Sequence, residues 1–148
     1  FHTELAGASF DAYQMQFDFH LAGAVEPERM RAAGQALLDR HPTLRAAFTT
    51  DSAGDRVQII QNSVTLPWHE EDLSGFAAKE RAERLKQFLA AEHGTRFDVA
   101  RAPLARMSLV KMADDAWELV FTAHHALFDG WSIPLLMQDL MRLYGTAG

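Results

Sequence analysis

The sequence predicts a mixed α/β fold in which three helices pack on a largely antiparallel sheet of five or six strands. Residues 14–21 alternate between apolar and polar side chains, which is the period of a strand with one buried and one wetter face. Residues 74–93 carry apolar side chains at helical spacing. Residues 104–112 and 116–123 are two apolar segments separated by a short polar turn, which predicts an antiparallel hairpin.

The composition narrows the classes of function. The 148 residues carry a net charge of −6, which gives no basis for binding nucleic acid or anionic lipid, since both depend on positive charge. Cysteine is absent, so disulfides, thiolate metal sites and cysteine nucleophiles are excluded. The sequence also lacks a run of roughly 18–20 apolar residues and a signal-peptide pattern. We therefore expect no nucleic-acid partner, no membrane partner and a cytoplasmic location.

The first helix is expected to begin at Pro27, because proline suits a first helical turn and Glu26 and Glu28 suit its positive end. It ends before Pro42, since the residue that precedes a proline avoids the α region. Its apolar stripe consists of Met30, Ala33, Leu37 and Leu38.

Residues 44–50 and 56–61 predict a hairpin around the turn cluster 51–55, and residues 65–69 predict a weaker extended segment. The second helix is expected over residues 74–93, with Ser74 as its N-cap and Gly94 as its stop. Its expected buried face consists of Ala78, Ala82, Leu85 and Leu89.

Residues 97–103 read as a loop before the second hairpin. The strand over residues 116–123 is apolar at almost every position, so we expect it to lie centrally with both faces covered. The last helix is expected to begin near Ser132, which can cap it, and Pro134 is tolerated in its first turn.

The segment 123–132 stands apart because two adjacent histidines follow an apolar strand. In an extended backbone, neighbouring side chains point to opposite faces, so one imidazole would face inward and the other a cleft. Imidazole is suited to proton transfer near neutral pH, although such a pair is more often structural. His125 and Asp129 have a spacing that can ligate a metal, but no convincing third ligand accompanies them, so we expect no metal. Ser132 lacks the Gly-x-Ser-x-Gly context of a nucleophile.

Three stretches together resemble a known family. Residues 124–130 are similar to the HHxxxDG motif of the chloramphenicol-acetyltransferase-like superfamily, and the Trp-Ser pair that follows narrows the resemblance to condensation domains of nonribosomal peptide synthetases. Residues 40–48 are similar to the motif RHxxLRxxF of that family, and residues 97–106 resemble its FD…PLxR segment.

The resemblance implies roles for individual residues. His125 matches the catalytic histidine, which acts as a general base or positions the amine. His124 matches the structural member of the pair. Asp129 matches an aspartate that holds the motif by a salt bridge, and Arg40 or Arg45 is its expected partner, with Arg40 slightly favoured.

Three further motif residues follow. Gly130 is expected to keep a substrate tunnel open, and Trp131 and Ser132 are candidates for lining it, although Trp131 fits a core position equally well. The remaining histidines are interpreted as incidental: His2, His20, His41, His69 and His93.

The resemblance also implies a domain organisation. Residues 1–148 would be the N-terminal lobe of a condensation domain, half of a chloramphenicol-acetyltransferase-like fold, with the first motif truncated and the C-terminal lobe absent. Because the tunnel lies between two lobes, we expect the isolated lobe to be inactive. Leu127 and Phe128 resemble domains that accept D-configured donors.

The implied function is amide bond formation between a donor acyl thioester and an acceptor aminoacyl thioester, in antibiotic or siderophore biosynthesis. Phosphopantetheine arms of carrier proteins would present both substrates, and no cofactor would bind the chain directly. The expected partners are donor and acceptor peptidyl carrier protein domains, the missing C-terminal lobe and a neighbouring adenylation domain. The alternatives are an epimerisation domain or another acyltransferase of the superfamily, and a non-catalytic lobe that binds carrier proteins.

Overall fold

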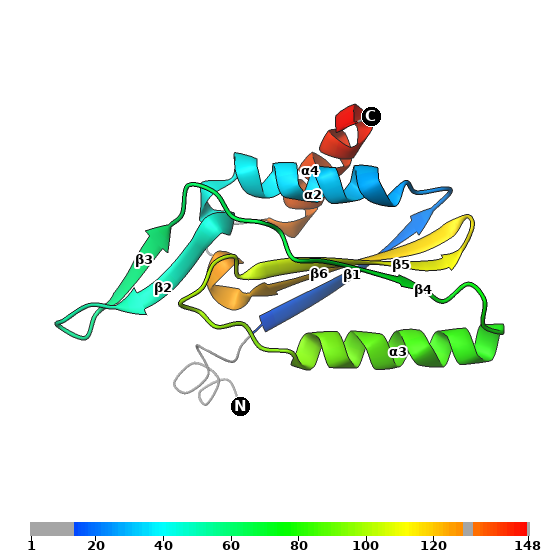
Figure 1. Cartoon of the computed structure of the whole chain (residues 1–148), viewed down its shortest axis with the longest axis horizontal. Coiled ribbons are helices and arrows are strands. Elements are labelled where there is room, and N and C mark those ends of the chain that lie inside the picture. Colours follow the sequence, from blue (N-terminus) through cyan, green and yellow to red (C-terminus); the bar gives the residue numbers. More distant parts are fainter. Residues whose placement is uncertain (1–13, 129–131, 148) are drawn as a thin grey trace.

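A four-stranded sheet in the order β1-β6-β5-β4 forms the centre of the structure (Figure 1). The computed structural model describes residues 14–128 and 132–147. In the sheet, β6 pairs antiparallel with β1 and β5, whereas β4 pairs parallel with β5. A separate antiparallel hairpin, β2-β3, extends from one end of the molecule. The strands are β1 (Gln14–Ala22), β2 (Ala46–Thr50), β3 (Arg56–Ile60), β4 (Trp68–Asp72), β5 (Ala105–Ala113) and β6 (Ala116–His124).

Helices lie on both faces of the sheet (Figure 1). Helices α2 (Pro27–Arg40) and α4 (Ile133–Ala147) pack on one face and contact each other, and α3 (Ala78–Gly94) lies along the opposite face. The predicted class, a mixed α/β fold with three α-helices and largely antiparallel strands, is thus confirmed for the described residues, although the six strands form a four-stranded sheet and a separate hairpin rather than one sheet. Within the described parts of the chain, no helix combines the length and apolarity that crossing a membrane requires.

The core lies between the sheet and the α2-α4 layer. Alternate residues of β6, including Leu119 and Phe121, point into this layer and meet Leu37 of α2 and Leu140 of α4 in one buried cluster. Because β6 is flanked by two strands and has both faces covered, eight of its nine residues are buried. The expected central position of this strand is confirmed.

Three predicted boundaries are wrong. The segment expected to be a strand from residue 44 begins as the 3-10 helix η1 (Pro42–Arg45), since proline suits a first helical turn. The extended segment expected at 65–69 is displaced to β4, where parallel pairing with β5 sets the register. Ser74 does not cap α3, whose N-cap is Ala77. Instead, the backbone N–H and the hydroxyl of Ser74 both donate to Asp72 Oδ1, which forms a turn before the helix.

The expected buried face of α3 is also wrong, because no residue of this helix is buried. Ala78 and Ala82 are exposed, while Leu85 and Leu89 are half-buried. Helix α3 covers the face of the sheet that carries the polar residues of β1. Hydrogen bonds contribute to this packing: Gln16 Nε2, for example, donates to the carbonyl of Leu89 at 2.9 Å.

Candidate active site

The end of the central strand positions the two adjacent histidines. His124 is the last residue of β6 and is 1% exposed, whereas His125 is exposed. The expectation of an extended backbone through both residues is wrong, because His125 already opens the 3-10 helix η2 (His125–Phe128). The turn at this point separates the pair into one buried and one exposed imidazole.

Hydrogen bonds to the backbone hold His124 in place. Its own N–H donates to the carbonyl of Leu104 on the approach to β5 at 2.9 Å, and the N–H of Ala126 donates to His124 Nδ1 at 3.0 Å. A ring nitrogen that accepts such a bond carries no proton, so the neutral imidazole of His124 has its proton on Nε2. The buried ring therefore supports the turn that presents His125.

The structure describes only some of the residues that follow the histidine pair in the motif. Asp129, Gly130 and Trp131 lie outside the described residues, so their predicted roles stay predictions. Leu127 is 3% exposed and belongs to the core cluster. Ser132 is half-buried and directly precedes α4, where its carbonyl accepts a hydrogen bond from Leu136 N–H at 3.0 Å.

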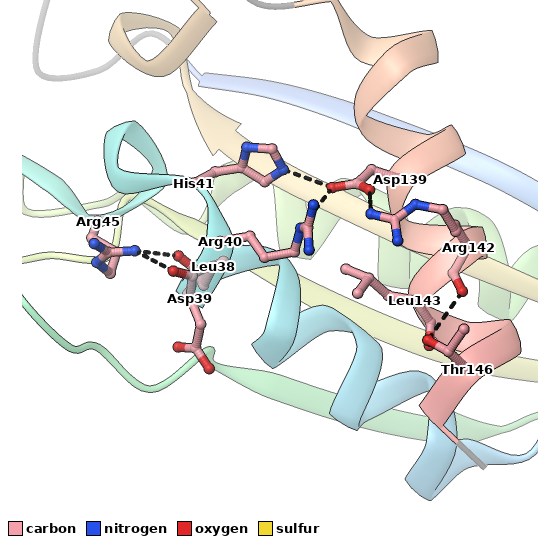
Figure 2. Close-up of polar contacts among 9 residues, drawn as sticks. All are labelled: Leu38, Asp39, Arg40, His41, Arg45, Asp139, Arg142, Leu143 and Thr146. Atoms are coloured by element: carbon pink, nitrogen blue, oxygen red, sulfur yellow. Dashed lines mark hydrogen bonds and ion pairs between the residues drawn. The ribbon is translucent and has the colours of Figure 1, made fainter.

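Arg45 joins the end of α2 to the β2-β3 hairpin. Its Nη1 donates to the carbonyls of Leu38 and Asp39 at 2.7 and 2.9 Å, which Figure 2 shows, and its Nε donates to the carbonyl of Gln61 at 2.8 Å. The carbonyls at the C-terminal end of a helix lack partners within the helix, and a cationic donor both satisfies them and complements the helix dipole.

Asp139 of α4 gathers three basic side chains, as Figure 2 shows. His41 Nε2 lies 2.8 Å and Arg40 Nε 3.6 Å from Asp139 Oδ2, and Arg142 Nη2 pairs with Oδ1. The hydrogen bond from His41, with Arg142 as a further cause, lowers the pKa of the Asp139 carboxyl against the opposing effect of burial. His41, interpreted from the sequence as incidental to function, has a structural contact that joins the end of α2 to α4.

The predicted salt bridge of Asp129 stays a prediction, because Asp129 lies outside the described residues. Among the described residues, Arg40 pairs with Asp139 and Arg45 binds backbone carbonyls. Sequence reasoning missed Asp139. The available signal was an acidic residue beside Leu140 on the helix that follows the histidine motif.

Arg106, in the motif over residues 97–106, also has a structural role. Arg106 on β5 pairs with the carboxylate of Glu92 and donates to the carbonyls of Glu92 and Thr95, each at 2.6 Å. Its guanidinium also lies 4.3 Å from the centroid of the Phe97 ring, a cation–π distance. Arg106 thereby fixes the C-terminal end of α3 to the sheet.

Comparison with known proteins decides the family. The sequence profile described as "Condensation domain" matches residues 1–148. The chain belongs to the condensation-domain family. Such domains are acyltransferase-type catalytic domains of nonribosomal peptide synthetases.

Its relatives are far longer than this condensation-domain chain. Bacitracin synthase 1 of Bacillus licheniformis is 30% identical over 98% of the chain, which spans only 3% of that protein. Phosphinothricin tripeptide synthetase PhsC of Streptomyces viridochromogenes is 36% identical over 91% of the chain, which spans 12% of that protein.

Solved structures share the fold. The SgcC5 protein from Streptomyces globisporus is 26% identical with a TM-score of 0.81, over 90% of this chain and 30% of that one. The starter condensation domain of rhizomide synthetase RzmA is 23% identical with a TM-score of 0.80, over 98% of this chain and 36% of that one. At the latter identity, the likeness concerns the fold alone.

The exposed position of His125 allows its imidazole to take part in acid–base chemistry or hydrogen bonding. An exposed imidazole just beyond the end of a central strand can accept a proton or a hydrogen bond from an approaching substrate. In this condensation-domain chain, only His125 of the pair has that exposure, because His124 is buried.

Proposed function

We propose that the chain is the N-terminal lobe of a condensation domain that forms an amide bond between two carrier-bound thioesters. The observation that carries the proposal is the division of the histidine pair, with His124 buried and bonded to the backbone and His125 exposed beside it. Membership of the condensation-domain family over residues 1–148 supports it.

The proposed reaction is a direct acyl transfer. The nitrogen of the acceptor amine attacks the carbonyl carbon of the donor thioester, the C–N bond forms and the C–S bond breaks. The amine loses a proton, and the departing sulfur of the donor phosphopantetheine takes one. No acyl-enzyme is required, which agrees with the absence of cysteine and of a serine elbow.

His125 is proposed as the catalytic residue that binds the amine. Alignment of two reactants can supply effective molarities of about 10⁵–10⁸ M, whereas general-base assistance typically adds about 10²–10⁴-fold. A thioester is already reactive, so we favour positioning of the amine as the larger contribution of His125. Gly130 is proposed to leave room for the phosphopantetheine arm.

A second lobe is proposed to complete the site. The chain spans 30% to 36% of the solved chains compared above, which supports a site shared with further sequence. The proposed partners are donor and acceptor carrier protein domains, that second lobe and a neighbouring adenylation domain. The isolated chain is accordingly proposed to be inactive, with no cofactor bound directly.

The test uses the complete parent synthetase with donor and acceptor carriers loaded, followed by quenching and mass spectrometry of the condensed thioester. We expect His125→Ala to slow amide formation at least about 10²-fold without lowering thermal stability. His69→Ala is the matched control, since His69 is exposed on β4 and paired with Glu71. A wild-type rate in His125→Ala overturns the proposal, as does inversion of the donor α-carbon without amide formation.

A second substitution separates the two roles of His125. Glutamine keeps a hydrogen-bonding group but cannot take up a proton near neutral pH. If positioning dominates, His125→Gln is expected to retain a rate at least about tenfold above that of His125→Ala. Equal loss in the two variants would contradict the positioning role and favour general-base catalysis.

A further inference from the structure

A second cluster of metal-binding side chains lies toward the other end of β6, away from the histidine pair. Asp18 and His20 share one face of β1, and Glu118 on β6 is the register partner of His20. One potential ligand atom from each residue lies within 4.8 Å of the other two. His124 lies six positions after Glu118 along the strand, which is about 20 Å at the usual strand rise. The cluster is therefore distinct from the candidate active site.

Two carboxylate oxygens in this cluster are buried without a partner. The Glu118 side chain is only 9% exposed, and its Oε1 has no hydrogen-bond partner within the described structure. Asp18 Oδ1 is likewise buried and has no hydrogen-bond partner within the described structure. The Asp18 carboxyl lies within hydrogen-bonding reach of Glu118. Buried acceptors that face each other without a donor are unfavourable, so this arrangement requires a proton or a cation between them.

We propose that Asp18, His20 and Glu118 bind a divalent transition-metal ion of the zinc class. Two carboxylate oxygens and one imidazole nitrogen form a donor set that Zn²⁺ accepts in tetrahedral sites with one position left to water. The imidazole favours Zn²⁺ and its transition-metal neighbours over Mg²⁺ and Ca²⁺, which prefer oxygen ligands alone. The fourth position opens to solvent on the side of His20, whose side chain is 80% exposed.

The geometry accommodates an ion with a small adjustment. Ligand atoms around a tetrahedral Zn²⁺ lie about 3.4 Å apart, given bonds of about 2.1 Å. In the cluster, His20 Nδ1 lies 2.5 Å from Glu118 Oε2, and one ligand atom from each of the three residues lies within 4.8 Å of the other two. Because the His20 side chain is 80% exposed, its ring can move outward and lengthen this separation without disturbing the core. The bound ion would join the edge strand β1 to the central strand β6 through side chains as well as through the backbone.

The experiment measures Zn²⁺ bound to the full chain within its natural protein, after treatment with a chelator and dialysis. Titration with Zn²⁺ against a fluorescent indicator, together with elemental analysis, gives the number of ions per chain. We expect His20→Gln and Glu118→Gln each to bind one ion fewer than the wild type. The visible absorption of Co²⁺ in place of Zn²⁺ should report a four-coordinate site in the wild type only.

His69→Gln is the matched control, because His69 pairs with Glu71 at 2.7 Å on β4 with no second carboxylate completing a cluster in the described structure. It is expected to bind as many ions as the wild type. Glu118→Gln also guards against misfolding, since its amide can donate to Asp18 and keep the pair satisfied without metal. Equal ion numbers in wild type, His20→Gln and Glu118→Gln overturn the proposal and leave a shared proton as the occupant. A wild-type Co²⁺ spectrum that His20→Gln does not alter overturns it as well.

Discussion

Asp139 gathers polar contacts between α4 and the end of α2, so Asp139→Ala tests their share of the stability of the scaffold. Asp139 is 18% exposed at its side chain and accepts contacts from Arg40, His41 and Arg142 (Figure 2). Alanine removes all three contacts and leaves the hydrophobic neighbours on α4 in place. The expected result is a destabilised domain with an otherwise unchanged core.

The magnitude follows from the exposure of the partners. Arg40 and Arg142 are each about half exposed, so each regains water and contributes about 0–1 kcal/mol. His41 is 25% exposed, and a hydrogen bond to a charged group contributes about 1.5–3 kcal/mol. We therefore expect Asp139→Ala to lower the free energy of unfolding by about 2 kcal/mol, which corresponds to a fall in Tm of about 4–8 °C.

Urea unfolding followed by circular dichroism at pH 7 measures this loss. Asp39→Ala is the matched control: Asp39 is an exposed acid at the end of α2, and its removal should stay within about 0.5 kcal/mol of the wild type. At acidic pH the difference in free energy of unfolding between the wild type and Asp139→Ala should become smaller. The pKa of Asp139 is lowered in the folded state, so its contribution is present above the ordinary value of 3.8 and is lost as the pH falls through the folded pKa. A variant within 0.5 kcal/mol of the wild type, or a difference unchanged at pH 3, refutes the reasoning.

Two further predictions concern the core and the polar face of the sheet. Gly34→Ala should lower stability by about 1 kcal/mol in the same urea assay, since a Cβ there would lie 2.7 Å from Leu66 Cδ2 and overpacking outweighs the gain in helix propensity. Gly94→Ala has open space and should not destabilise, and equal behaviour of the two variants would contradict the packing argument. Burial, followed by the Asp18 carboxyl, raises the pKa of Glu118 to about 7. In chelator-treated protein, wild-type stability should therefore fall as pH rises from about 4.5 to about 7, because the unfolded state releases this proton first. Glu118→Gln should remove that decline in Tm, and persistence of the full decline would show that other groups cause it.

The hydrophobic pattern of a segment was sufficient to predict a strand where each face of that strand has a uniform environment, either buried or partly exposed to water. The alternation over residues 14–21 predicted β1, and the apolar run of 116–123 predicted the buried central strand β6. The same reasoning failed for α3, because helical spacing of leucines does not say how closely a helix approaches its sheet. Here the opposing face is polar, and no residue of the helix is buried.

Two polar contacts that the sequence did not predict join residues far apart in the chain. His41 and Asp139 are 98 residues apart, and so are His20 and Glu118. The first pair forms because α2 and α4 share one face of the sheet, and the second because β1 and β6 are neighbours in one particular register. Neither topology nor register can be read from one sequence, so the sequence alone predicts neither of these contacts.

The scaffold anchors the histidine segment on both of its sides. Upstream, the backbone of His124 bonds to Leu104, and its ring accepts a hydrogen bond from Ala126. Downstream, Asp139 holds α4 against the end of α2. The described residues before and after residues 129–131 thus contact different elements of the fold. A residue whose proposed role is to align an amine benefits from such anchoring, since a displacement of about 1 Å can cost about 10²-fold in rate. Arg40 and His41, in the stretch 40–48, join the end of α2 to α4, and Arg106, in the stretch 97–106, joins the end of α3 to β5. Both stretches thus stabilise the scaffold from which His125 is proposed to act.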